Sequence, residues 1–160
     1  MKKITGLLAA FLCAMPAWAE NVKIVDGDSL EINEERIRLN GIDAPEFLQV
    51  CRDENNEDYS CGQQALRFLE SLIAEKSITC DCQPEKDKYG RKLCECFVDN
   101  LSINREMVHS GWAYPYRDDG RYMKELEQAQ TARAGMWQGK NMRPALYRIL
   151  EKVRLKKTDP

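Results

Sequence analysis

The run Val25-Asp26-Gly27-Asp28-Ser29, followed by Arg36-Ile37-Arg38-Leu39-Asn40-Gly41-Ile42-Asp43-Ala44-Pro45-Glu46, decides how this chain folds. Apolar side chains recur at every second position in and beside these runs, as they do in half-buried strands. They are Val22, Ile24, Leu30, Ile32, Ile37 and Leu39. Turn-forming segments at 26–27 and 33–35 separate the strands. The sequence therefore predicts a meander with Asp28 and Asp43 at one end of the sheet.

Carboxylates at that end of the sheet suit a hard cation. Calcium takes oxygen ligands from carboxylates, backbone carbonyls and water. Asp28 and Asp43 supply two carboxylates, and the carbonyl of Ala44 can supply a third oxygen. Pro45 biases Ala44 away from helix and so holds Glu46 near the cluster. The pattern predicts a Ca²⁺ site with a carboxylate, Glu46, placed to act on a water molecule.

Two arginines complete a phosphate-directed set. Arg38 lies on the predicted third strand, and Arg91 follows the turn Asp87-Lys88-Tyr89-Gly90. Cleavage of a phosphodiester concentrates negative charge on equatorial oxygens, which planar, permanently charged guanidinium groups complement well. Arg38 and Arg91 are therefore the candidates for binding and stabilising the phosphoryl group, with the metal as Lewis acid.

The remaining periodicity predicts helices around a sheet. Apolar residues at helical spacing indicate helices over 63–75 and 122–136, and a capping serine and a terminal glycine bound a third over 102–110. The predicted fold class is α+β with a mainly β core. We expect a five-stranded barrel of the OB-fold type with three packed helices and a basic C-terminal helix or tail over 141–160.

In combination these motifs resemble those of the staphylococcal nuclease (thermonuclease) family. Asp-Gly-Asp-Ser, Arg-Leu-x-Gly-Ile-Asp-x-Pro-Glu and Asp-Lys-Tyr-Gly-Arg occur in the family's order, and the likeness runs from about Val22 to Trp137. The resemblance implies a calcium-dependent nuclease that hydrolyses DNA and RNA, preferably single-stranded, with little sequence preference. We expect it to act as a monomer.

Residue by residue, the resemblance implies three kinds of role. Asp28, Asp43 and the Ala44 carbonyl would bind calcium. Arg38 and Arg91 would bind the phosphoryl group, and Glu46 would be the general base or would orient the attacking water. Lys88, Tyr89 and one or both of Tyr114 and Tyr116 would contact the nucleotide's terminal phosphate, sugar or base, with packing as the alternative role for Tyr114 and Tyr116.

The first 19 residues are predicted to be a secretory signal peptide. Lys2 and Lys3 form its charged start, 4–15 its apolar core and Ala17-Trp18-Ala19 its cleavage site. We therefore expect a mature chain from Glu20 in the periplasm or secreted, with no membrane association after cleavage. Residues 20–140 would form one domain.

Net charge opposes strong bulk attraction to nucleic acid. Without Lys2 and Lys3, 22 basic residues face 26 acidic ones, a formal charge of −4. Basic residues crowd the C-terminal tail, which we interpret as a solvated helix face in preference to a nucleic-acid clamp.

Cysteine usage fits an oxidising compartment. Cys13 leaves with the signal peptide and six cysteines remain. Cys51 with Cys61 would close an acidic loop. In an antiparallel hairpin about the Asp87 turn, Cys80 would face Cys96 and Cys82 would face Cys94. Disulfides are the first interpretation of that cluster, and buried thiols or a four-thiolate zinc site are the alternatives.

Other polar and aromatic residues receive structural interpretations. Asp26 is expected to cap backbone amides in a turn, His109 to be an exposed helix residue, and Trp112 and Trp137 to anchor the core. A purely structural ion-pair network remains an alternative for the acidic and basic cluster. The alternative function is a non-catalytic OB-fold module that binds single-stranded nucleic acid or another ligand.

Overall fold

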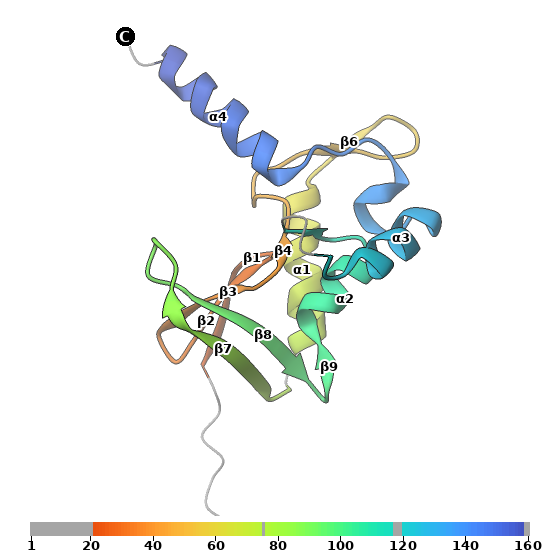
Figure 1. Cartoon of the computed structure of the whole chain (residues 1–160). Helices are drawn as coiled ribbons and strands as arrows, with labels where there is room; N and C mark the ends of the chain where they lie inside the picture. Colours follow the sequence, from red (N-terminus) through yellow and green to blue (C-terminus); the bar gives the residue numbers. More distant parts are fainter. Residues whose placement is uncertain (1–20, 75, 117–119, 159–160) are drawn as a thin grey trace, which may run out of the picture.

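A computed structural model describes residues 21–74, 76–116 and 120–158 (Figure 1). The predicted signal peptide and the mature start at Glu20 lie outside these residues. No helix in the described part of the chain is long and apolar enough to cross a membrane.

One curved sheet forms the core of the fold. Its strands are β1 (Val22–Asp26), β2 (Ser29–Ile32), β3 (Glu35–Leu39), β7 (Ile78–Lys86), β8 (Lys92–Val98) and β9 (Leu101–Ser102). The spatial order is β1-β2-β3-β8-β7, and β9 pairs with β8. The first three strands form the predicted antiparallel meander, and β3 then runs parallel to β8.

Strand pairing does not close the sheet into a barrel among the described residues. β1 and β7 are the two ends of the hydrogen-bonded order, and no strand pairing joins them. Helix α1 (Cys61–Ile73) packs against β1. The predicted α+β class with a mainly β core is confirmed, with β9 as an added short strand, and the five-stranded barrel stays a prediction.

The three expected disulfides are present. Cys51 is bonded to Cys61, while Cys80–Cys96 and Cys82–Cys94 join directly opposed positions of β7 and β8. Closing each loop restricts the unfolded chain and contributes on the order of 2 to 4 kcal/mol to stability. The paired bridges fix the hairpin whose tip carries Arg91.

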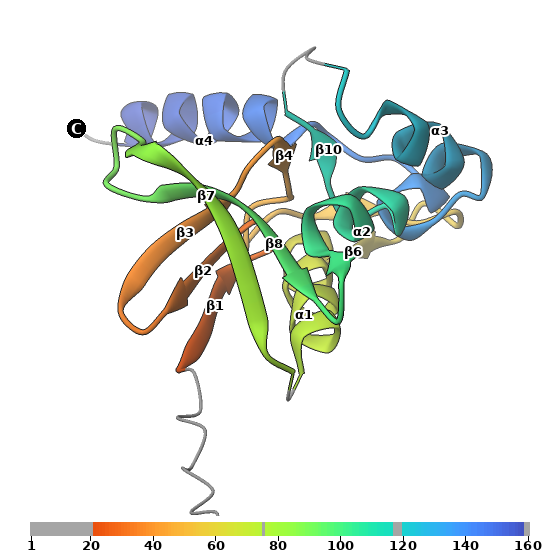
Figure 2. The same cartoon turned by 60° about the horizontal axis from the view of Figure 1, so that its bottom comes forward.

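Helices cover one side and one end of the sheet (Figures 1 and 2). Besides α1 they are α2 (Ile103–His109), α3 (Met123–Thr131), the 3-10 turn η1 (Gly135–Gln138) and α4 (Pro144–Thr158). As predicted, the Ser102 hydroxyl caps α2 by accepting the Arg105 amide. Exposed His109 is the last residue of α2.

The predicted helix over 122–136 is broken into α3 and η1. Arg133 adopts a left-handed backbone with φ of 53°, and Gly135 follows with the same φ. A Cβ at Gly135 would lie 2.5 Å from the carbonyl oxygen of Gly111, so the chain bends where two backbones meet closely. The helical spacing of the apolar residues does not record this contact.

Two hydrophobic clusters and one buried asparagine fix the strands and helices next to the site. Apolar side chains of the sheet, α1 and α2 form the main core, with Trp112 packed against it. Buried Asn104 of α2 donates to the carbonyls of Asn40 and Cys94 and accepts the amide of Cys96, which ties the helix to two strands. A smaller core of Cys51, Cys61, Tyr114 and Met136 packs against Trp137.

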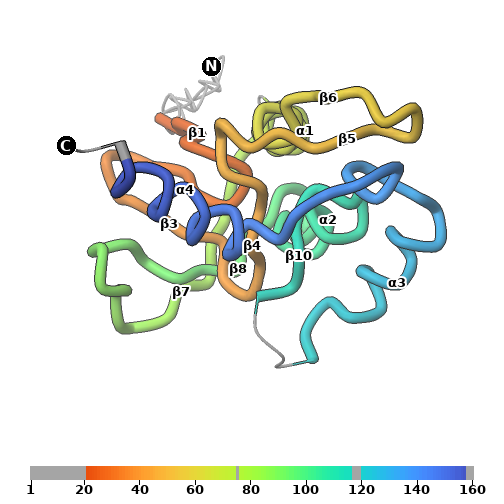
Figure 3. The backbone as a smooth tube through the Cα atoms, turned by 90° about the horizontal axis from the view of Figure 1, so that it is seen from above, coloured from red at the N-terminus to blue at the C-terminus, as the bar shows by residue number. Residues whose placement is uncertain are grey.

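Two short pairings complete the fold. β4 (Ile42–Asp43) pairs with β10 (Tyr114–Pro115), and β5 (Cys51–Arg52) pairs with β6 (Asp58–Tyr59). In the view from above, the tube of α4 lies over the end of the sheet near β3 and β4 (Figure 3). This places the basic C-terminal helix beside the predicted site.

Candidate active site

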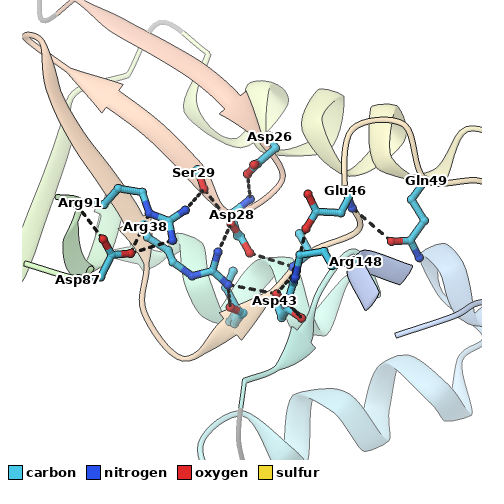
Figure 4. Close-up of polar contacts among 12 residues, drawn as sticks. Asp26, Asp28, Ser29, Arg38, Asp43, Glu46, Gln49, Asp87, Arg91 and Arg148 are labelled. Carbon is cyan, nitrogen blue, oxygen red and sulfur yellow. Dashed lines mark hydrogen bonds and ion pairs between the residues drawn. The ribbon is translucent and has the colours of Figure 1, made fainter. Parts of the chain in front are cut away.

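Asp28 is the buried acidic centre of the cluster (Figure 4). It follows the β1–β2 turn, where the Asp26 carboxylate accepts its amide at 3.0 Å, so Asp26 has the predicted capping role. The Asp28 side chain accepts hydrogen bonds from the Ser29 hydroxyl at 2.9 Å and the Ala44 amide at 3.1 Å. With 4% of its surface exposed, it is oriented by neighbours on two segments.

Arg38 joins the two predicted calcium ligands. It lies on β3 opposite Ser29 of β2, at the end of the sheet where Asp28 also lies. Its guanidinium donates to Asp28 Oδ1 at 3.0 Å and to Asp43 Oδ1 at 3.1 Å. The guanidinium carbon also lies 5.6 Å from the centre of the Tyr116 ring.

Asp43 and Glu46 meet a side chain from the far end of the chain. Arg148 of α4 donates to Asp43 Oδ1 at 3.0 Å and to Asp43 Oδ2 at 3.2 Å. The same guanidinium donates to Glu46 Oε1 at 2.7 Å. Two carboxylates of the predicted site therefore share one arginine that the sequence did not single out.

Glu46 is held by a tight turn. Its carbonyl accepts the Gln49 amide at 2.7 Å, and its own amide donates to Gln49 Oε1 at 3.3 Å. Gln49 is fully buried and donates from Nε2 to the Met142 carbonyl at 2.7 Å. Gln49 thus links the turn that carries Glu46 to the segment leading into α4.

Arg91 is fixed by the turn that precedes it. Asp87 accepts from Arg91 Nε at 2.9 Å and Nη2 at 2.8 Å, and its other oxygen accepts the amides of Tyr89 and Arg91. Arg91 Nη1 also donates to the Ser29 hydroxyl at 3.3 Å. Because Ser29 contacts Asp28, the second arginine is connected to the acidic centre.

These side chains surround one cavity of about 810 Å³. Four of the predicted polar site residues line it, together with the predicted nucleotide contacts Lys88, Tyr89 and Tyr116. The four are Asp28, Arg38, Glu46 and Arg91. Asp43 is not among the described residues that line the cavity, and its oxygens are bound by Arg38 and Arg148. The structure brings together groups from separate segments as the sequence predicted.

Tyr114 lies elsewhere. It is 7% exposed, packs in the smaller core with its ring centre 5.0 Å from that of Trp137, and bonds through its hydroxyl to Asn141. Burial raises its pKa to about 12. Of Tyr114 and Tyr116, only Tyr116 is among the described residues that line the cavity.

The acidic centre is incompletely neutralised. Burial raises the pKa of Asp28 to about 7, with contributions from Asp26 and Asp43, although Arg38 and the Ala44 amide act to lower it. Burial opposes the charge of Arg148, but hydrogen bonds to Asp43 and Glu46 raise its pKa above the ordinary value. Added positive charge near Asp28 would favour its ionised form.

The chain matches the model of the family described as staphylococcal nuclease homologue over residues 36–139. This stretch holds Arg38, Asp43, Glu46 and Arg91, four of the converging side chains. The chain belongs to this family. Asp28 precedes the matched stretch, and the β2–β3 pairing brings it to the others.

Three relatives show the breadth of this staphylococcal nuclease family. Succinoglycan biosynthesis protein ExoI of Rhizobium meliloti is 35% identical over 145 residues, covering 85% of this chain and 75% of that protein. An uncharacterized endonuclease of Haemophilus influenzae is 33% identical over 143 residues, covering 84% and 74%. Thermonuclease of Staphylococcus hyicus is 25% identical over 116 residues, covering 68% and 66%. The family and the two nuclease relatives support a phosphodiester hydrolase.

The donor set of this nuclease homologue fits a hard divalent cation. Asp28 and Asp43 present buried carboxylates, and Asp26 and Glu46 add acidic groups at the cavity. Across the described residues, no three His, Cys, Asp or Glu side chains are grouped to hold a metal ion by themselves. A calcium ion here would need oxygens beyond side chains, from the Ala44 carbonyl and from water.

Sequence reasoning missed three contributors to the site. Arg148 and Lys152 of α4 line the cavity, which corrects the interpretation of the tail as a wholly solvated face. Gln49 was missed because a polar residue between exposed Leu48 and Val50 has no strand or helix pattern. The one feature of the sequence that could have pointed to Gln49 is its side-chain amide, which can both donate and accept hydrogen bonds in the turn after Pro45.

Proposed function

We propose that this protein is a calcium-dependent nuclease that hydrolyses phosphodiester bonds of DNA and RNA with little sequence preference. The observation that carries the proposal is the convergence of two carboxylates, two arginines and a candidate base at one end of the sheet. Asp28, Arg38, Asp43, Glu46 and Arg91 come from three separate segments. Arg38 bonds directly to both aspartates, while Arg91 is connected through Ser29 and Glu46 through Arg148. A structural ion-pair network would have no need of an open cavity beside it.

Arg38 and Arg91 would bind the scissile phosphate. Each guanidinium is mostly buried, with side chains 15% and 17% exposed, and each is held by carboxylate partners. A charge that is already oriented needs little reorganisation when negative charge develops on the phosphoryl oxygens. We expect these arginines to stabilise the transition state more than the bound substrate.

Glu46 would accept the proton of the attacking water. It is the site carboxylate with the greater access to solvent, its side chain being 36% exposed against 6% for Asp28 and Asp43. A bound calcium ion, held by Asp28, Asp43 and the Ala44 carbonyl, would add charge neutralisation and Lewis acidity. Water would attack phosphorus, the bond to the leaving oxygen would break, and Glu46 would carry the water's proton away.

Lys88, Tyr89 and Tyr116 would contact the nucleotide around the phosphate. Tyr89 is 58% exposed at the tip of the β7–β8 hairpin, and the amine of Lys88 lies 5.0 Å from its ring centre. Exposed aromatic rings stack on any unpaired base, and cations follow the backbone. These contacts favour single-stranded nucleic acid without reading its sequence.

Local charge offsets the acidic whole. Six basic and four acidic side chains line the cavity, so its lining has an excess of positive charge although the mature chain carries −4. The six basic ones are Arg36, Arg38, Lys88, Arg91, Arg148 and Lys152. We infer that the protein works as a monomer in the periplasm or outside the cell, where its three disulfides persist.

Incubation of the purified mature protein with labelled single-stranded DNA, duplex DNA and RNA tests the proposal. Calcium should support cleavage of all three, fastest for the single strands, and a chelator should stop it. The non-catalytic binding module predicts retention of the labelled strands without cleavage in either buffer. Intact substrates in calcium, with the strands bound, would favour that module.

A further inference from the structure

The contact between Arg148 and Asp43 occupies both oxygens of a predicted calcium ligand. Arg148 Nη1 and Nη2 lie 3.0 and 3.2 Å from Asp43 Oδ1 and Oδ2, and Arg38 adds a third donor at 3.1 Å from Oδ1. Calcium binds carboxylate oxygens at about 2.3 to 2.6 Å. A divalent ion at Asp43 would therefore compete with the guanidinium for the same oxygens and repel its charge.

The Arg148 guanidinium also binds Glu46, the candidate base. Its Nη1 lies 2.7 Å from Glu46 Oε1, closer than to either oxygen of Asp43. The guanidinium thereby takes an acceptor position that an attacking water would otherwise use to donate to Glu46 Oε1. One side chain thus covers the metal ligand and the base together, and Asp43 is missing from the described residues that line the cavity.

Helix α4, which carries Arg148, makes few contacts that hold it to the rest of the protein. Its side chains Leu146, Ile149, Leu150 and Val153 are between 47% and 58% exposed, so little apolar surface holds α4 to the body. Besides the bonds of Arg148, the Tyr147 hydroxyl of α4 donates a hydrogen bond to the Leu48 carbonyl at 3.3 Å. In Figure 1 the helix projects from the body toward the C-terminus.

Firm contacts end at the first residue of the helix, buried Pro144. Arg52 and Lys140 form a β-bridge, and buried Gln49 bonds to the Met142 carbonyl. α4 starts at Pro144, directly after this anchored segment. The helix can therefore separate from the site while the chain up to Met142 stays attached.

We propose that α4 is a tethered inhibitor whose Arg148 holds the site closed until calcium displaces it from Asp43 and Glu46. This inference rests on the proposed function, because it concerns the same calcium site. Calcium binding and Arg148 docking exclude each other, so the docked helix lowers the apparent affinity for calcium by the fraction of open molecules. Calcium both completes the site and uncovers it.

Calorimetric titration of the mature protein with Ca²⁺ alone tests the competition. Arg148→Ala should bind Ca²⁺ about 10-fold more tightly than the unmodified protein, as expected if about one molecule in ten is open without calcium. Arg154→Ala is the matched control. It removes the same charge from the same helix at a side chain that is 76% exposed and pairs with Glu151, and its affinity should stay within about twofold.

Hydrogen exchange of the unmodified protein provides a second measurement that needs no variant. A released helix of 15 residues is marginal in water, so Ca²⁺ should speed amide exchange over 144–158 and slow it over 26–30 and 42–46.

The failures are distinguishable. Equal affinities for Arg148→Ala and the unmodified protein would overturn the inhibitor and leave the calcium site standing. Equal gains in Arg148→Ala and Arg154→Ala would reduce the effect to net charge and also overturn it. Absence of Ca²⁺ binding in every variant would overturn the inhibitor and the calcium-dependent function together.

Discussion

Two regions supply the polar groups of the cavity, and they are held in different ways. The rim of the sheet carries Asp28, Arg38 and Arg91, and the adjoining β4–β10 pair carries Asp43. These strands and turns are pinned by backbone pairing and, behind Arg91, by two disulfides. Helix α4 carries Arg148 and leaves its apolar residues in solvent. The fixed groups are suited to chemistry that demands constant geometry, and the loosely held one is suited to regulation.

The difference also separates two uses of arginine. Arg38 and Arg148 both bond to Asp43, but Arg38 is 15% exposed and Arg148 is 34% exposed. Buried, pre-oriented charges stabilise a transition state without reorganisation. A more exposed pair is worth less and is more readily exchanged for another cation. The position of each arginine in the fold therefore sets its role.

The largest expected effect on cleavage comes from removing Arg38 or Arg91, the two arginines fixed at the rim. Arg38→Ala or Arg91→Ala should lower the turnover of single-stranded DNA by about 10² to 10³-fold with a smaller change in substrate binding. Steady-state kinetics in saturating calcium measures both quantities, and circular dichroism checks the fold. Arg105→Ala, on α2 in an exposed pair with Glu125, is the control and should cleave at the unmodified rate. Unchanged turnover in Arg38→Ala would place the chemistry elsewhere.

A smaller effect concerns the pH dependence of stability. Burial raises the pKa of Asp28 from 3.8 to about 7, so the folded protein binds its proton more tightly than the unfolded chain does. The stability gained from this proton is complete below pH 3.8 and is lost as the pH rises through about 7. Without calcium, the free energy of unfolding should therefore fall by on the order of 4 kcal/mol across this range.

Denaturant titrations in chelator at several pH values measure this fall, with Asp28→Asn as the comparison. The variant has no titrating group at this position and should lose that part of the pH dependence. Parallel curves for the two proteins would show that Asp28 is ionised throughout, and the rim would then be fully neutralised by its arginines.

Local sequence patterns predicted the rim because its geometry is local. Period-two alternation placed Asp28, Arg38 and Asp43 at one sheet end, and equal spacing about the Asp87 turn paired the four hairpin cysteines. The five-stranded barrel stays a prediction, because closure depends on pairing between distant edge strands, which alternation does not specify. The third helix was overextended because its break depends on the close approach of Gly111 and Gly135.

The contact of Arg148 with Asp43 could not be predicted in the same way. Arg148 lies 105 residues from Asp43 in sequence and was one of several basic residues in the tail. The sequence could not choose between a substrate contact and packing for Tyr114 and Tyr116, and the structure turns the ring of Tyr114, on β10, into the smaller core. Contacts of this kind depend on how separate elements dock, and single-sequence periodicity carries no record of that.

The single-turnover rate of Glu46→Gln in saturating calcium tests the central claim most directly. The substitution preserves the shape of the side chain and removes the base, and Asp28 and Asp43 remain to bind calcium. The account predicts that cleavage of single-stranded DNA falls by about 10² to 10⁴-fold, while Glu127→Gln on exposed α3 cleaves normally. Cleavage by Glu46→Gln at the unmodified rate would contradict the assignment of this cluster as the catalytic site.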